Sequence, residues 1–465
     1  MSDTQTQPDT QPVLPIVTRR TAWIYGSVSL PLAIISYPLG VWIPRLYSTE
    51  IGIDLGLIGL VIFSAAIFDA ISDPAMGFFS DKLETRWGRR KPWMAIGVPL
   101  YAFSVWMLLN PESGATIYYL AFFFVLLRAS TTVLGLPYAA WGMELSSEYH
   151  TRTMIQSARE KYVLSGLIVA SAIVLVSEEV FNNTNASFVL SNFSWVIVSV
   201  LPVCAMLVIW QVPEVPVSPS APKVSVFRSL GNMYKNKLFF RLLVIELLIA
   251  GGENFRNTLS LFFVQDYIGA DRVGRLYVIY FGVGLAAIPF WDWVAKRYGK
   301  HQSLATAMVL VGIIAMSCFA LDYGQVTEFY FLFAAKGFCF GAFAYLPRAM
   351  LADVVDLDTV KSGSPRPASY MAILGFMTKC AASFGGLSLP ILGAVGYSAA
   401  AGAINGPDEL MWLGILYAVV PTVVFIIAFY LCITWPLTAP VHERLQRLVE
   451  RKQLRLANRL VESSN

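Results

Sequence analysis

The chain has 465 residues, of which 56% are hydrophobic and only 14% are charged, and its formal net charge is +4. A mean hydropathy of +0.60 excludes an ordinary soluble protein and indicates a polytopic membrane protein. The five cysteines have no metal-ligand or redox spacing, and the three histidines fall in polar connecting segments. We therefore expect no metal site, no resident cofactor, no nucleic-acid partner and no histidine proton relay inside the membrane.

Residues 1–20 form a polar tail, and about twelve apolar runs follow it along the chain. Each run has roughly twenty residues, which is the length of a membrane-spanning helix. The runs are continuously apolar rather than alternating, which predicts helices and not barrel strands. They begin near Ala22, Gly56, Trp93, Ile117, Tyr162, Phe193, Phe239, Leu276, Leu304, Phe329, Ala372 and Met411.

Basic residues are concentrated in the connections that follow the even-numbered runs, as in residues 82–91 and 296–300. By the positive-inside rule, both termini are predicted to be cytoplasmic. A proline-rich, basic connector at residues 213–237 divides the chain near its middle. We expect an all-α membrane protein with twelve transmembrane helices in two six-helix bundles, residues 21–212 and 238–436, followed by a basic cytoplasmic tail at 437–465.

Two carboxylates lie inside the second apolar run. Asp69 and Asp73 are four residues apart, so on a helix they share one face. Pro74 has no N–H to donate, which frees the carbonyl of Ala70 between them. Ionisable groups inside a membrane helix usually face a cavity, and oxygen-only clusters suit hard cations and protons. This stretch is therefore the leading candidate for a coupling-ion site.

Several motifs, taken in their order along the chain, resemble one family. They are Asp69-Ala-Ile-Ser-Asp73-Pro, Arg86-Trp87-Gly88-Arg89-Arg90, Leu136-Pro137-Tyr138, Met350-Leu-Ala-Asp353-Val-Val-Asp356, and Lys379. The chain thereby resembles the glycoside-pentoside-hexuronide:cation symporters of the major facilitator superfamily. The resemblance implies an alternating-access carrier of the cell inner (plasma) membrane, which couples a sugar to Na⁺, Li⁺ or H⁺.

In that family the paired aspartates of helix two and a threonine of helix four ligate the cation. Asp69, Asp73 and Thr132 match these positions, whereas Gly135 stands where an acidic or amide ligand is expected. The resemblance also implies substrate-binding roles for Arg159 and Lys379. One cation ligand of the family pattern is therefore missing here.

Arg128 lies four residues before Thr132, on the same predicted helix face. Either it pairs with Asp69 or Asp73 in place of the cation, or it faces the substrate and binds a carboxylate, sulfonate or phosphate. The sequence leaves both readings open. If the pairing is permanent, the carrier need not be sodium-coupled.

The seventh run contains Glu253 and Arg256, either a structural ion pair or a sugar acceptor beside an anion-binding arginine. Cavity candidates of positive charge outnumber the negative ones, which favours an anionic solute such as a hexuronide or a sulfated sugar. Tyr138, Trp141 and Tyr345, close to helix breaks or motif residues, are candidates for stacking on a sugar.

A second group of charged residues is predicted to gate the two bundles. The arginine-rich loop after the second run can form salt bridges with acidic residues that end the tenth run in one state and release them in the other. Positive-inside topology alone explains the basic residues, but not the acidic ones. The gating candidates are Asp81, Arg86, Arg89, Arg90, Asp353 and Asp356.

The sequence thus predicts a secondary active transporter that acts as a monomer in the lipid bilayer. It is expected to carry a sugar or glycoside into the cell together with a monovalent cation. Two alternatives remain within transport: a cation-independent facilitator, and a carrier of an amphipathic, lipid-like anion. An enzyme is not expected, because the loops contain no Gly-rich phosphate loop, metal-ligand cluster or Ser-His-Asp order.

Overall fold

The computed structural model describes residues 17–82, 85–146, 148–214, 236–362 and 367–436. Within these ranges all regular elements are helical, and ten helical segments are long and apolar enough to cross a membrane. Helices suit these apolar sequences because each helix satisfies its own backbone N–H and C=O groups without water. The all-α membrane class predicted from the sequence is confirmed. The predicted tail at 437–465 and most of the connector at 213–237 fall outside the described residues.

The first half of the chain contains α1 (Arg19–Gly26), α2 (Ser29–Ile34), α3 (Ser36–Arg45), α4 (Leu55–Lys82), α5 (Lys91–Leu109), α6 (Ile117–Glu144), α7 (Tyr149–Glu179) and α8 (Ala186–Gln211). The second half contains α10 (Lys237–Phe262), α11 (Gly274–Tyr298), α12 (Lys300–Phe319), α13 (Val326–Ser362), α14 (Pro367–Ala394), α15 (Pro407–Gly414) and α16 (Val420–Ile433). Three π-helical turns extend or join these helices: η1 (Leu46–Glu50), η2 (Phe263–Tyr267) and η3 (Ile415–Val419).

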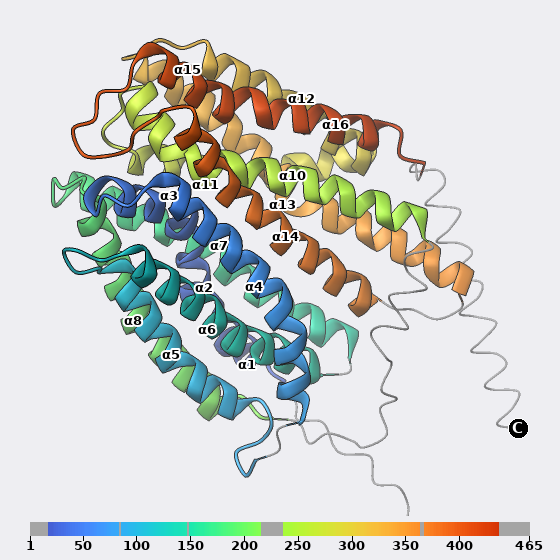
Figure 1. Ribbon diagram of the computed structural model, residues 1–465. Helices are drawn as coiled ribbons and strands as arrows, with labels where there is room; N and C mark the ends of the chain where they lie inside the picture. The colour runs from blue at the N-terminus through green and yellow to red at the C-terminus, as the bar shows by residue number, and fades with distance from the viewer. Residues whose placement is uncertain (1–16, 83–84, 147, 215–235, 363–366, 437–465) are drawn as a thin grey trace, which may run out of the picture.

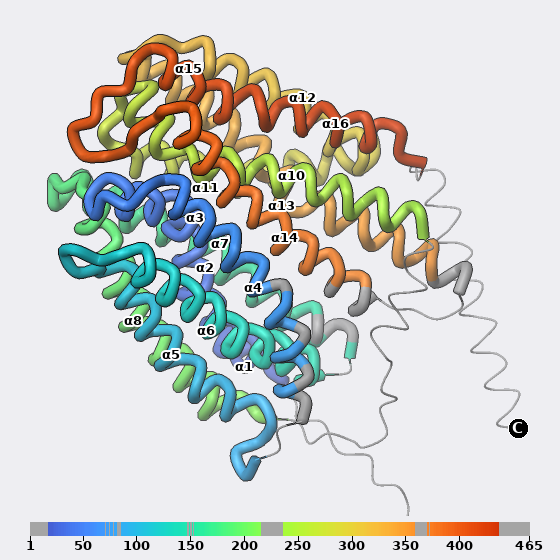
Figure 2. The backbone as a smooth tube through the Cα atoms, in the orientation of Figure 1, coloured from blue at the N-terminus to red at the C-terminus, as the bar shows by residue number. Residues whose placement is uncertain are grey.

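Helices α1 to α8 lie together as a first group, and α10 to α16 lie together as a second group (Figure 1). The groups contact each other mainly through α4 with α14, α7 with α11, and α3 with α10. Figure 2 shows α4 and α14 running side by side where the two groups meet. Side chains on α4 and α14 are consequently placed at the centre of the interface.

Glycine allows α4 and α14 to touch. A Cβ added to Gly386 of α14 would lie 2.6 Å from the backbone nitrogen of Phe63 and 2.7 Å from the carbonyl oxygen of Gly59, both on α4. A larger residue at this position would force the two helices apart. The contact therefore fixes the separation of the two groups at this level.

Polar contacts join the two groups at one end of the molecule. Arg45 donates two hydrogen bonds to the Asp266 carboxylate, at 2.8 and 3.3 Å. The buried carboxylate of Glu178 accepts hydrogen bonds from the backbone N–H groups of Val273 at 3.1 Å and Gly274 at 2.7 Å. We call this the closed end; toward the other end, where α4 and α13 finish, the two groups spread apart (Figure 1).

Candidate functional site

Five polar side chains from three helices meet at the interface between the groups. Asp69 and Asp73 come from α4, Arg128 and Thr132 from α6, and Lys379 from α14. Each pair on one helix is four residues apart, so the α-helical repeat places both members on the face that meets the neighbouring helix. The Thr132 hydroxyl lies 3.0 Å from Asp73 Oδ1 and 3.3 Å from Asp69 Oδ1.

Each carboxylate also has a basic partner. Arg128 Nη1 lies 3.5 Å from Asp69 Oδ2, and the Lys379 ammonium forms an ion pair with Asp73 Oδ2. Asp69 is buried, with 4% of its surface exposed. The two negative and two positive formal charges therefore cancel, which lowers the cost of placing them inside an apolar bundle. Lys379 is the member that comes from the second group of helices.

The remaining oxygen atoms of this cluster are suitable ligands for a small hard cation. Two carboxylates and a hydroxyl converge from α4 and α6, and oxygen donors are those that Na⁺-like and Mg²⁺-like ions prefer. At Gly135, one helical turn beyond Thr132, an added Cβ would meet nothing within 4 Å. The missing family ligand thus corresponds to open space beside the cluster.

In the structure, Arg128 forms an ion pair with Asp69. Its guanidinium also lies 5.4 Å from the ring centre of Phe124, and its Nε is buried without a hydrogen-bond partner among the described residues. Of the two readings that the sequence left open, ion pairing is the one that this conformation contains. The pairing therefore uses only part of the hydrogen-bonding capacity of the guanidinium.

Arg159 on α7 behaves differently from the other membrane-embedded basic residues that the sequence singled out. It donates a hydrogen bond to Gln156 Oε1 at 3.2 Å, and its guanidinium lies 5.1 Å from the ring centre of Tyr138. Within the described part of the chain it has no carboxylate partner, and its Nε has no hydrogen-bond partner. Its positive charge is therefore available to a ligand.

The aromatic candidates on α6 are part of the packed interior. Tyr138 stacks on Tyr25 with ring centres 4.6 Å apart, and its hydroxyl donates to the Tyr25 carbonyl at 2.6 Å. Trp141 is fully buried and donates from Nε1 to the Pro213 carbonyl at 3.1 Å. In this conformation neither ring presents a face for sugar stacking. Tyr345, on α13, is half-buried, and its hydroxyl has no hydrogen-bond partner among the described residues.

Glu253 and Arg256 form an ion pair within α10, where they are three residues apart. Sequence analysis missed their neighbour Lys336 on α13, which is only 4% exposed. The signal was present, because Lys336 is a single charged residue within a long apolar run. This cluster lies inside the second group of helices, apart from the cluster at the interface.

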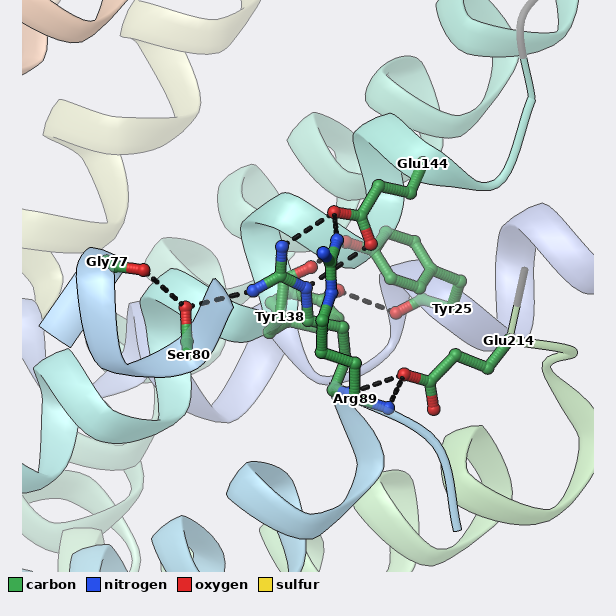
Figure 3. Close-up of polar contacts among 8 residues, drawn as sticks. Tyr25, Gly77, Ser80, Arg89, Tyr138, Glu144 and Glu214 are labelled. Carbon is green, nitrogen blue, oxygen red and sulfur yellow. Dashed lines mark hydrogen bonds and ion pairs between the residues drawn. The ribbon is translucent and has the colours of Figure 1, made fainter. Parts of the chain in front are cut away.

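The arginine-rich loop is bound to its own half of the molecule (Figure 3). Arg89 and Arg90 both form ion pairs with Glu144 at the end of α6, and Arg90 also donates to Ser80 Oγ at 2.9 Å. Glu214 accepts hydrogen bonds from the backbone N–H groups of both arginines, at the start of α5. Sequence analysis missed the two glutamates, because nothing in the pattern relates residues so far apart.

The acidic gating candidates lie on α4 and α13. Asp353 pairs with Lys300 of its own group, at 2.6 Å. Asp356 is half-buried on α13, Arg86 is exposed, and the side chain of Asp81 lies outside the described residues. Closure of the two groups by the arginine loop and the acidic end of α13 stays a prediction.

The chain is similar in sequence to known proteins. Residues 24–439 match the family model described as MFS/sugar transport protein. The glucuronide carrier protein homolog of Escherichia coli is 23% identical, over 84% of this chain and 87% of that protein. The sodium-dependent lysophosphatidylcholine symporter 1-B of Danio rerio is 24% identical, over 85% and 82%.

Solved structures agree on the fold. The structure of a bacterial homolog of the human lysosomal transporter Spinster, in an inward-facing and unoccupied conformation, has a TM-score of 0.62 and 12% identity, over 93% of this chain and 98% of that one. The matched proteins are transporters and not enzymes. Ten helices in the described part of the chain are long and apolar enough to cross a membrane, so the chain is a multi-pass membrane protein. It belongs to the MFS/sugar transport protein family, as its resemblance to the glycoside-pentoside-hexuronide:cation symporters predicted.

Proposed function

We propose that this protein is a symporter that moves a sugar or glycoside together with Na⁺ or H⁺ by alternating access. The observation that carries the proposal is the cluster of Asp69, Asp73 and Thr132, which Lys379 reaches from the opposite group of helices. Such an arrangement links ion occupancy to contact between the two groups. Symporters among its relatives add support.

The coupling follows from competition for the same oxygens. A cation that binds Asp69 and Asp73 replaces the positive charge of Lys379 and releases α4 from α14 at this level. A solute that binds more tightly to the released state then raises the affinity for the cation. The cation raises the affinity for the solute by the same factor. The ion pairs are therefore the ion-free state of the cycle.

The topology that goes with this function has twelve spans. Helices α10 and α14, with 26 and 28 residues, are long enough to join the ten apolar spans. Residues 21–212 and 238–436 then form two six-helix bundles, with both termini and the 213–237 linker in the cytoplasm. The closed end faces outward, so the described conformation is inward-facing. We place the protein in the cell inner membrane as a monomer.

Substrate charge follows from which basic residues are already paired. Arg128, Lys379 and Arg256 each have a carboxylate partner, whereas Arg159 has none among the described residues. A free guanidinium suits a carboxylate or sulfonate, which it can bind through two hydrogen bonds. A hexuronide or sulfonated sugar is therefore the solute that we favour.

Each of two alternative functions has an observation in its favour. Permanent pairing of Arg128 and Lys379 with the aspartates would make the protein a cation-independent facilitator. A carrier of an amphipathic anion is supported by the sodium-dependent lysophosphatidylcholine symporter among the relatives, and a narrow apolar crevice runs between α7, α11 and α13. It is lined by Leu164, Leu167, Ile168, Phe281, Gly284, Leu285, Ile288, Phe340, Gly341 and Ala344.

Uptake into proteoliposomes distinguishes these functions. The panel contains neutral glycosides, hexuronides, sulfonated sugars and a lysolipid, each with and without an inward Na⁺ or H⁺ gradient. Gradient-driven accumulation should be lost in Asp73→Asn and kept in Glu112→Gln, a control at an exposed loop position. Equilibration that ignores the gradient and is unchanged in Asp73→Asn would mean a facilitator. Loss of hexuronide uptake in Arg159→Gln, with neutral glycosides unaffected, would assign the anion contact.

A further inference from the structure

The second group of helices encloses an unbalanced charge. Glu253 and Arg256 on α10 and Lys336 on α13 interact electrostatically with one another. Arg256 and Lys336 are 1% and 4% exposed. With one carboxylate and two basic groups, the cluster has a formal charge of +1. An uncompensated charge inside an apolar bundle is strongly unfavourable.

Among the described residues, Arg256 Nε and the Lys336 ammonium lack hydrogen-bond partners. The Glu253 carboxylate is bound by an outer nitrogen of Arg256, while Arg256 Nε is buried without a partner among the described residues. In that part of the chain the Lys336 ammonium makes no hydrogen bond or ion pair either. Both unused donors are positively charged, so the group that completes them is an acceptor with negative charge.

Aromatic rings surround the Lys336 ammonium. The ammonium lies 5.2, 5.3 and 5.9 Å from the ring centres of Phe333, Tyr280 and Tyr417. Ring faces attract a cation and not a neutral amine. Among the described residues, the ionisable groups that interact with the cluster from α11, α12 and η3 are Tyr280, Cys318 and Tyr417, and none of these three is a carboxylate. The surrounding helices therefore stabilise the positive charge without neutralising it.

We propose that a small monovalent anion, chloride, binds between Lys336 and Arg256 as a resident ion. The cluster is enclosed by α10, α11, α12, α13 and η3, which excludes a sugar-sized solute. The site is separate from Asp69 and Asp73, so it does not depend on which solute is carried. Its role is to neutralise the second group of helices and stabilise its packing.

Thermal unfolding of the purified full-length protein in detergent tests this site. Sodium chloride is compared with sodium gluconate at equal sodium concentration and ionic strength, and sodium bromide serves as a second small anion. The wild-type midpoint should rise saturably by roughly 3 °C in chloride. Lys336→Met should lose the response and be at least as stable in gluconate as the wild type, since its cluster is already neutral. Lys336→Arg should keep the response, as should Lys161→Met at an exposed position on α7.

Equal wild-type midpoints in chloride and gluconate would overturn the proposal, as would an undiminished chloride response in Lys336→Met. Equilibrium binding of radiolabelled chloride to the wild type gives a readout that requires no variant. One saturable site per chain is expected, and no saturable binding would also overturn the proposal.

Discussion

The contact between α7 and α11 at the closed end gives a sharp test of alternating access. A Cβ added to Gly274 would lie 2.6 Å from the backbone nitrogen and Cα of Leu175 and 2.9 Å from Glu178 Oε2. Backbone atoms cannot rotate away as a side-chain tip can. The substitution Gly274→Ala must therefore push α11 away from α7.

The size of the effect follows from these distances. To reach the 3.4 Å at which ordinary van der Waals contact begins, the two backbones must separate by about 0.8 Å. This movement stretches the hydrogen bonds from Val273 and Gly274 to the Glu178 carboxylate, now 3.1 and 2.7 Å long. Hydrogen bonds to a charged group contribute about 1.5–3 kcal/mol each, so weakening both costs about 3 kcal/mol. The ratio of closed to open molecules should then fall roughly a hundredfold.

Distances between spin labels measure this ratio. Labels on Thr184→Cys and Ala401→Cys, in a background without the native cysteines, report the separation of the two groups at the closed end, where both positions are exposed. Gly274→Ala should move the distance distribution to longer values. Gly282→Ala, on the same helix, should not, because its added Cβ meets nothing within 4 Å. A Gly274→Ala distribution identical to that of the wild type would refute the reasoning.

Three further outcomes are expected. Glu144→Gln should lower the thermal unfolding midpoint, because it removes the carboxylate charge that binds both Arg89 and the buried Arg90, a loss of about 1.5–3 kcal/mol. Gly135→Asp should tighten Na⁺ binding, measured by Na⁺-dependent stabilisation, roughly tenfold, because it adds a carboxylate in open space beside the cation cluster. Burial, with a smaller contribution from Asp266, raises the pKa of Tyr397 above its usual value. Its hydrogen bond to Asp266 is then fully present below the ordinary tyrosine pKa and lost only above it, so the spin-label distances should not change between about pH 6 and pH 9.

Each of these outcomes has a counterpart that would contradict it. Glu148→Gln removes an exposed carboxylate that accepts a local hydrogen bond from Thr151, at 2.7 Å. An equal loss of stability in this variant would show that the Glu144 ion pairs contribute nothing particular to stability. Unchanged Na⁺ affinity in Gly135→Asp would place the ion elsewhere. A closed end that opens as the pH rises from 6 to 9 would show that another group controls it.

Much of the arrangement within single helices could be predicted from the sequence. Asp69 and Asp73 share a face because of the α-helical repeat, and the predicted all-helical membrane class and the family are confirmed. Contacts between side chains on different helices were harder to predict. Periodicity indicates which residues share a face of one helix, but not which neighbouring helix that face contacts. Lys379 was singled out, yet its bond to Asp73 crosses 306 positions in the chain. Glu178 shows the same limit, since a glutamate at a helix end gives no sign that it will cap another helix.

The neutrality of the central cluster has an electrical consequence. Asp69, Asp73, Arg128 and Lys379 sum to zero formal charge in the ion-free state, so the membrane voltage exerts little net force on this cluster as the empty carrier reorients. Adding a monovalent cation gives the cluster one positive charge, on which 100 mV acts with up to about 2.3 kcal/mol. Through this cluster, the voltage would then favour inward movement of the cation-bound state and leave the ion-free return unaffected. Uptake of a neutral glycoside would gain this driving force, whereas the carboxylate of a hexuronide would cancel it.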